Sequence, residues 1–162
     1  TEENMNITII SVGKIKEKYF TAAIDEYSKR LSRFAKLNII EVADEKIPDN
    51  ASEKEMEQIK EKEGNKILAK LPQNSFVVTL CIEGKEHSSE ELAKKIVDIS
   101  MTSSHITFII GGSLGLSDTV KSKSALRLSF GKMTLPHQLI RVVLLEQIYR
   151  AFKINNNESY HK

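Results

Sequence analysis

The sequence has a single cysteine, Cys81, and no apolar run as long as a membrane-spanning helix. One cysteine excludes an internal disulfide framework and fits a reducing compartment, where this thiol is expected to be an inert core group. A membrane span needs about 18 consecutive apolar residues. The N-terminal stretch TEENMNITIISVG lacks the basic region and the cleavage pattern of a signal peptide. These absences predict a cytoplasmic protein that does not enter a membrane.

Motifs for metals and nucleotides are also missing. No G-x-x-x-x-G-K-[ST] segment occurs, and no G-x-G-x-x-G follows the first apolar segment, which excludes the P-loop and dinucleotide fingerprints. The four histidines are spread along the chain, and none stands with acidic residues at metal-ligand spacing: His87, His105, His137 and His161. We therefore expect no metal site.

Positive charge is concentrated toward the end of the chain. The 162 residues carry a net charge of only +2. Residues 119–162 contain eight Lys or Arg and two acidic residues, a net charge of +6, which leaves −4 for residues 1–118. Such a basic end indicates either an anionic partner or a set of scattered, solvated lysines, and charge alone does not decide between them.

Apolar, β-branched segments alternate with segments of helical periodicity. The expected strands are 6–12, 37–43, 75–82, 105–112 and 125–130. The expected helices are 17–34, 52–71, 88–101, 117–122 and 136–154. Continuous apolar strands separated by helices predict a single α/β domain over residues 1–162, with a mostly parallel sheet covered on both faces. Residues 1–4 are expected to be a remnant of expression or an alternative start.

The segment GGSLG at 111–115 fits G-x-S-x-G, the nucleophile elbow of serine hydrolases, and lies between a strand and a helix. A hydrolase would use Ser113 with Asp118 and either His137 or His161. Asp118 is only five residues away, however, and fits better as a helix-capping residue beside Ser117. A glycine turn at the end of a parallel strand also lets backbone amides approach a ligand. Hydrolase, ligand-binding turn and plain tight turn all remain open here.

The helix expected at 136–154 is apolar on nearly every side, and Pro136 suits its first turn. A helix that is apolar all round is buried all round. In a small domain, one face would pack on the sheet and the other would meet a second subunit. Glu146 and Arg150 have the spacing of an ion pair on the helix surface. The polar tail 155–162 is either an inert terminus or a segment that folds over the active site.

Four segments together resemble one known family. They are FIIGGSLGL (108–116), LSFGKMTLPHQLIRVVLLEQIYRAFKI (128–154), the terminal YHK, and ITIISVGKIKEKYF (7–20). They are similar to the bacterial pseudouridine N3-methyltransferases of large-subunit ribosomal RNA, minimal members of the SPOUT class. The resemblance covers almost the whole chain, with its segments in the same order.

The resemblance implies a Rossmann-like α/β fold with a C-terminal trefoil knot, in a homodimer formed through helix 136–154. A knot would be exceptional among folds. The implied cofactor is S-adenosylmethionine, held by three stretches at the strand ends. By resemblance, its binding residues are Leu80, Gly111, Gly112, Phe130, Gly131, Lys132, Met133, Thr134 and Leu135.

The implied reaction is methylation of N3 of a pseudouridine in the helix 69 loop of 23S rRNA, within assembled ribosomes. By resemblance, Tyr160 and His161 are the catalytic candidates, because N3 must lose a proton as the methyl group arrives. Arg141, Arg150 and Lys162 are the candidates for RNA contact, with the basic end of the chain as an electrostatic footprint. A non-catalytic RNA-binding dimer is the remaining alternative.

Overall fold

Five parallel strands form one sheet in the order β2-β1-β4-β3-β5. The computed structural model describes residues 5–162, so the expectation for residues 1–4 lies outside the described part. The strands are β1 Asn6–Val12, β2 Lys36–Val42, β3 Phe76–Glu86, β4 His105–Ile110 and β5 Leu126–Ser129. The predicted parallel sheet is confirmed.

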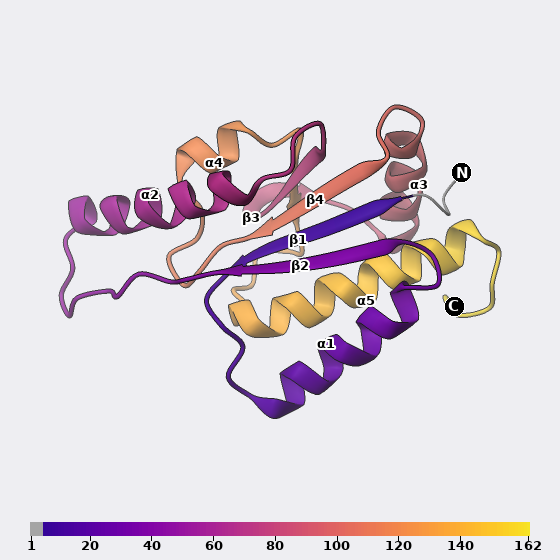
Figure 1. The fold of residues 1–162 in the computed structure, drawn as a ribbon, viewed down its shortest axis with the longest axis horizontal. Coiled ribbons are helices and arrows are strands. Elements are labelled where there is room, and N and C mark those ends of the chain that lie inside the picture. The colour runs from indigo at the N-terminus through magenta and orange to yellow at the C-terminus, as the bar shows by residue number, and fades with distance from the viewer. Residues whose placement is uncertain (1–4) are drawn as a thin grey trace.

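Helices cover both faces of this sheet (Figure 1). They are α1 Lys18–Leu31, α2 Glu53–Lys70, α3 Ser89–Ser100, α4 Asp118–Ser122 and α5 His137–Asn155. Helices α1, α3 and α5 share one apolar core with the sheet, and α2 and α4 share the other. The described chain is a three-layer α/β domain, as the alternation of patterns predicts.

Burial on both faces explains why the central strands β1 and β4 read as continuous apolar runs. Along β1, Ile7 and Ile9 enter the core under α1, α3 and α5, whereas Ile10 and Val12 enter the core under α2 and α4. All four side chains are at most 3% exposed. Successive residues of a strand point to opposite faces, so a strand buried on both sides needs apolar residues at nearly every position.

Side-chain caps set the starts of the helices on the α2–α4 face. Ser52 and Glu55 form a reciprocal capping box at the start of α2. Ser117 caps α4 by accepting a hydrogen bond from the Val120 N–H at 3.2 Å, and Asp118 is the first residue of that helix. Pro136 precedes the first residue of α5 rather than occupying it, one position from the expectation.

Strand β3 departs most from its prediction, because it continues to Glu86 instead of ending at residue 82. Leu80 and Lys85 both lie opposite Leu128 of β5, so residues 81–84 bow out of the ladder as an arch. Gly84 allows the arch to close, since a Cβ there would lie 2.7 Å from the Arg127 carbonyl oxygen. The arch brings the end of β3 over the carboxyl edge of the sheet.

Candidate active site

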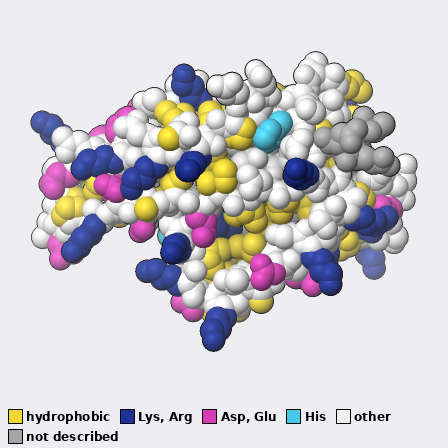
Figure 2. Space-filling model, in the orientation of Figure 1, with side chains coloured by type: hydrophobic (Ala, Val, Ile, Leu, Met, Phe, Trp, Pro, Cys, Tyr) yellow, Lys and Arg dark blue, Asp and Glu magenta, His cyan; other side chains and the backbone are white. Residues whose placement is uncertain are grey.

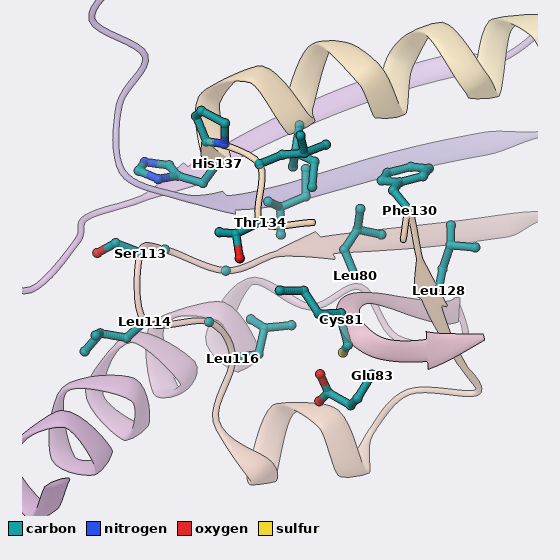
Figure 3. A pocket seen from close by; sticks show the side chains of 18 of the residues that line it. Leu80, Cys81, Glu83, Ser113, Leu114, Leu116, Leu128, Phe130, Thr134 and His137 are labelled. Atoms are coloured by element: carbon teal, nitrogen blue, oxygen red, sulfur yellow. The ribbon is translucent and has the colours of Figure 1, made fainter. Parts of the chain in front are cut away.

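A cavity of ≈ 680 Å³ lies at the carboxyl ends of β3, β4 and β5 (Figure 3). Three stretches line it: the β3 arch, the turn 111–116 after β4, and the loop 130–136 that leads into α5. In Figure 3 the turn with Ser113 and Leu114 faces the arch with Leu80 and Cys81, and Thr134 and His137 enter from the side of α5. Ligands of open α/β sheets bind at this edge.

Most residues proposed for the cofactor lie together on the wall of this cavity. Those that line it are Leu80, Gly111, Gly112, Phe130, Gly131, Met133, Thr134 and Leu135. Lys132 is exposed and is not part of the lining. Lys132 was counted among the cofactor-binding residues because it belongs to the same loop. The sequence of a loop does not show which of its side chains point outward.

The turn after β4 can be built only with little side-chain bulk. A Cβ on Gly111 would lie 2.8 Å from the backbone carbon of Gly115, and one on Gly112 would lie 3.2 Å from Val12. The turn closes on itself through a hydrogen bond from the Gly115 N–H to the Gly112 carbonyl at 3.0 Å. Gly115 has a φ of +85°, which favours glycine. The turn therefore leaves its backbone open to a ligand.

Ser129 ties the loop before α5 to the β3 arch. Its hydroxyl donates to the Ile82 carbonyl at 2.9 Å and accepts the Gly131 N–H at 3.1 Å. Gly131 has a φ of +120°, which a residue with a Cβ rarely adopts. Beyond this anchor, Met133 is 83% exposed at the rim of the cavity. These hydrogen bonds therefore hold together two walls of the cavity that are distant in sequence, the β3 arch and the loop before α5.

The cavity walls are mostly apolar, and their polar side chains are neutral or paired. Burial raises the pKa of the Cys81 thiol, which therefore stays protonated. Glu83 accepts a hydrogen bond from the Lys121 ammonium at 2.6 Å, which lowers the pKa of the carboxyl. Apolar walls beside open backbone suit a flat adenine ring and its attached chain. The residues present therefore fit S-adenosylmethionine.

His137 lines the same cavity, although the sequence analysis did not include it among the site residues. Burial, and next to it the charge of Arg141, lowers the pKa of the imidazole, while Asp44 opposes this shift. The ring is therefore uncharged near neutral pH. Its place directly after Pro136, at the start of a helix that follows a glycine loop, is the sequence signal that points to it.

Arg141 corrects the sequence analysis, because its guanidinium is enclosed by the fold. The side chain is 4% exposed and pairs with Glu41 at 2.7 Å. It also donates to the carbonyls of Val12 and Gly13 at 2.7 and 2.9 Å. Its donors therefore fasten α5 to the ends of β1 and β2, and they are not available to RNA. Helical spacing placed Arg141 near the loop but did not reveal these backbone partners.

The tail forms a network on the far end of α5. Tyr160 donates to Glu146 at 2.8 Å, and Arg150 makes the predicted pair with Glu146 at 3.0 Å. Arg150 also donates to Nδ1 of His161 at 3.0 Å, and His161 Nε2 contacts Glu90. Because an arginine only donates, Nδ1 accepts and the ring proton belongs on Nε2. The catalytic candidates and Arg150 are thus brought together.

None of residues 155–162 lines the cavity of their own chain. The cavity adjoins the first turn of α5, whereas the tail follows its last turn, and 19 helical residues span about 28 Å. The expected tail over the active site is therefore not formed within one chain. Lys162 is exposed at the end of this segment.

Glu63 of α2 is a buried carboxyl behind the glycine turn. Its Oε1 would lie 3.4 Å from a Cβ on Gly112, and its Oε2 accepts the Glu45 N–H at 2.9 Å. Burial raises the pKa of this carboxyl from its ordinary value of 4.5, and the nearby Asp44 adds to the rise. The stability that the carboxyl contributes is therefore full below pH 4.5 and is lost as the pH rises through the folded-state pKa.

A Glu63→Gln variant is expected to be more stable than the wild type by about 1 kcal/mol at pH 8, with no gain at pH 4. The amide cannot ionise, and its oxygen can still accept the Glu45 N–H. Urea unfolding at both pH values measures the difference. If the substitution changed the free energy of unfolding equally at pH 4 and pH 8, ionisation of Glu63 would not destabilise the folded protein.

The hydrolase alternative finds no support in the geometry. Within residues 5–162, Ser113 makes no hydrogen bond to a histidine or a carboxylate, although His137 lines the same cavity. Asp118 is committed to the first turn of α4. The described residues also contain no cluster of His, Cys, Asp and Glu that would hold a metal ion. No helix in this part of the chain is long and apolar enough to cross a bilayer.

Comparisons with known proteins agree with this geometry. A family model described as "Predicted SPOUT methyltransferase" matches residues 5–161. A protein of Clostridioides difficile (strain 630) named Ribosomal RNA large subunit methyltransferase H is 60% identical over 159 residues, 98% of this chain and 100% of that protein. The protein of the same name from Clostridium botulinum (strain Kyoto / Type A2) is 64% identical over the same shares of both chains.

Among solved structures, a "probable methylase family protein" from Haemophilus influenzae Rd KW20 has a TM-score of 0.53 and 15% sequence identity. The alignment covers 100% of this chain and 72% of that one, and it supports the fold. With the family model and the full-length relatives, the predicted resemblance is confirmed. The chain belongs to the SPOUT family of methyltransferases, enzymes whose methyl donor is S-adenosylmethionine.

Proposed function

We propose that this protein methylates N3 of a pseudouridine in the helix 69 loop of 23S rRNA, within assembled ribosomes in the cytoplasm. The observation that carries the proposal is the 60–64% identity over 98% of the chain to proteins named Ribosomal RNA large subunit methyltransferase H. The nucleotide and the ribosomal context come from the family that the sequence resembles. The cavity at the carboxyl edge of the sheet is the site that the reaction requires.

In this proposal the cavity holds S-adenosylmethionine, which supplies an activated methyl group. Leu80, Phe130 and Leu135 are the apolar walls of the pocket, and the backbone of Gly111 and Gly112 is the surface that polar groups of the cofactor meet. The main task of the chain is then to place the target nitrogen in line with the methyl group and to exclude water. Met133, exposed at the rim, is positioned to cover a ligand.

The proposed homodimer uses the face of α5 that the described chain leaves half-buried. Leu139, Val142 and Val143 lie on this face, whereas Leu144 and Ile148 are fully buried in the core. Burial of exposed apolar side chains favours association of two such faces. We also propose the trefoil knot of the family, on the strength of the resemblance.

The dimer would solve the problem of the distant tail. If two α5 helices pack in opposite directions, the last turn of one helix lies beside the first turn of the other. The tail of one subunit then reaches the cavity of its partner. Within one chain the tail cannot reach the cavity, because about 28 Å of helix separates them. Each active site would combine a cavity from one subunit with Tyr160 and His161 from the other.

The tail groups differ in what they can do with a proton. Burial, together with the hydrogen bond to Glu146, raises the pKa of Tyr160 to about 12. Its hydroxyl is therefore a hydrogen-bond donor at neutral pH and not a base. His161 is the group that we propose to receive the N3 proton at Nδ1, after the Arg150 guanidinium that now donates to this nitrogen has moved away. Arg150 and Lys162 are proposed to contact RNA, the former after exchanging its pair with Glu146.

The test is transfer of a labelled methyl group from S-adenosylmethionine to ribosomes that lack the modification. Free rRNA and ribosomes without pseudouridine are the controls. We expect label on the large-subunit RNA of whole ribosomes and little on either control. Cofactor binding without transfer to any of the three substrates would leave the non-catalytic RNA-binding dimer as the better account. If Ser113→Ala removed an esterase activity instead, the hydrolase would be restored.

A further inference from the structure

A short basic loop connects β1 to the first turn of α1. We use the name basic loop for residues 13–20 (GKIKEKYF), which are the connection 13–17 and the first three residues of α1. It carries three exposed lysines: Lys14, Lys16 and Lys18. Within residues 5–162, none of these ammonium groups forms an ion pair or a hydrogen bond. Figure 2 shows Lys and Arg side chains over the part of the surface where this loop leaves β1. With the exposed Glu17 between them, these three cations give residues 14–18 a net charge of +2.

Three hydrogen bonds hold this loop beside the cavity. The Gly13 carbonyl accepts from Arg141 at 2.9 Å, and the Ile15 N–H donates to Glu41 at 3.1 Å. The Lys16 N–H donates to the side chain of Gln138 at 3.4 Å. Gln138 follows His137, which lines the cavity. The basic loop therefore lies against the first turn of α5, where its path is visible in Figure 1.

An exposed aromatic ring stands at the end of the same loop. Tyr19 is 66% exposed, and its ring centroid lies 4.6 Å from that of Phe20. An exposed aromatic ring beside lysines is available for contact with another molecule. Cations that bind phosphates, next to a ring on which an unpaired base can stack, are the combination that single-stranded nucleic acids require.

Four of the eight cations at the end of the chain are committed within the fold. The other four are exposed and form no ion pair within the described residues: Lys123, Arg127, Lys132 and Lys162. Arg141 is enclosed by the fold, and Arg150, Lys121 and Lys153 are paired with carboxylates of the same chain. Such pairs must break before these groups can bind phosphate. The basic loop needs no such exchange, although it belongs to the part of the chain with net negative charge.

We propose that the basic loop is the main contact of this enzyme with the RNA strand, in which Lys14, Lys16 and Lys18 bind phosphates and Tyr19 stacks on an unpaired base next to the target. The inference rests on the proposed function, since it assumes an RNA loop as substrate. Stacking on a neighbour suits a target in a loop, because an unpaired base is free to leave its own stack. Recognition then comes from the rim of the cavity without an additional RNA-binding domain.

A triple variant, K14Q/K16Q/K18Q, tests the phosphate contacts. Its matched control is K54Q/K70Q/K94Q, in which three exposed, unpaired lysines of α2 and α3 lose the same charge. Binding to ribosomes lacking the modification is measured over a series of salt concentrations. We expect the loop variant to bind at least about tenfold more weakly and to reduce the slope of log K against log salt by about 3, one for each phosphate contact. The control keeps the wild-type slope.

Cofactor affinity and oligomeric state are measured on both variants. Unchanged values show that the loop substitutions act on RNA and not on the fold. A wild-type salt slope in the loop variant overturns the proposal. If the wild type transfers no methyl group but the loop variant still binds ribosomes more weakly, the proposed reaction fails and the RNA contact stands. If transfer occurs and both triple variants behave alike, only the RNA contact fails.

Tyr19→Ala and Tyr19→Phe separate stacking from charge. The alanine variant is expected to lose about 5- to 150-fold in RNA affinity without a change in salt slope, and the phenylalanine variant to keep wild-type affinity. A second copy of this chain is the competing partner for the exposed ring. If Tyr19→Ala dissociates the dimer, the ring belongs to the subunit interface, and its assignment to RNA is overturned.

Discussion

A Gly111→Val variant is expected to bind S-adenosylmethionine about 100-fold more weakly than the wild type, a loss of about 2.7 kcal/mol. The added Cβ would lie 2.8 Å from the carbon and 2.9 Å from the oxygen of the Gly115 carbonyl, so the turn must open. The backbone that faces the cavity then moves away from the cofactor. Titration calorimetry with purified protein measures the loss directly.

The same substitution also lowers stability, by about 1–3 kcal/mol, because the clash is with backbone and cannot be relieved by a rotamer change. Gly64→Ala is the matched control, since its Cβ would lie 2.6 Å from the Ser117 hydroxyl and does not line the cavity. We expect this control to lose stability and to keep cofactor affinity. Wild-type affinity in Gly111→Val would show that the cofactor binds elsewhere.

Deletion of Tyr160 to Lys162 is expected to lower methyl transfer by about 10²- to 10⁴-fold while cofactor affinity stays unchanged. None of these residues lines the cavity of its own chain, so their loss should not change the affinity for the cofactor. The Glu146–Arg150 pair lies within α5 and remains in the truncated protein. Single-turnover transfer to ribosomes and calorimetry with the cofactor measure the two quantities. Full activity of the truncated protein would show that the tail is not catalytic.

Mixed dimers reveal which subunit supplies the tail. The truncated chain has an intact cavity, and the Gly111→Val chain has an intact tail, so each homodimer is expected to be inactive. Half of the dimers in an equal mixture contain one of each, and each of these has one complete site if the tail serves the partner. Transfer should then recover to about a quarter of the wild-type rate. If the tail serves its own cavity, mixing restores nothing.

The sequence predicted most elements closely because local physics determines them. The central strands β1 and β4 are buried on both faces, and their continuous apolar runs distinguish them from loops. The capping box at Ser52 marks the start of α2 without reference to the rest of the chain. The strand order and the arch at residues 81–84 have no such local signal, since both depend on how distant segments pair.

The site was predictable where backbone shape determines it and less so where side-chain partners do. The glycines at 111 and 112 indicated a turn that could approach a ligand, and the loop at 130–135 was assigned through the resemblance to the family. Arg141 was misassigned because its partners, Val12 and Gly13, are about 130 residues away in sequence. Lys132 belongs to the same loop but is exposed and does not line the cavity. His137 lines the cavity because α5 packs against the edge of the sheet, which the sequence does not show.

The measurement that tests the central claim most directly is the location of the methyl group on the RNA. A methyl group on N3 blocks the Watson–Crick edge of the base, so reverse transcription should stop one nucleotide before it. After incubation of unmodified ribosomes with enzyme and cofactor, we predict one new stop in the helix 69 loop of 23S rRNA. Nucleoside mass analysis should identify a methylated pseudouridine there. A methyl group on a ribose, on another nucleotide or on a protein would contradict the account.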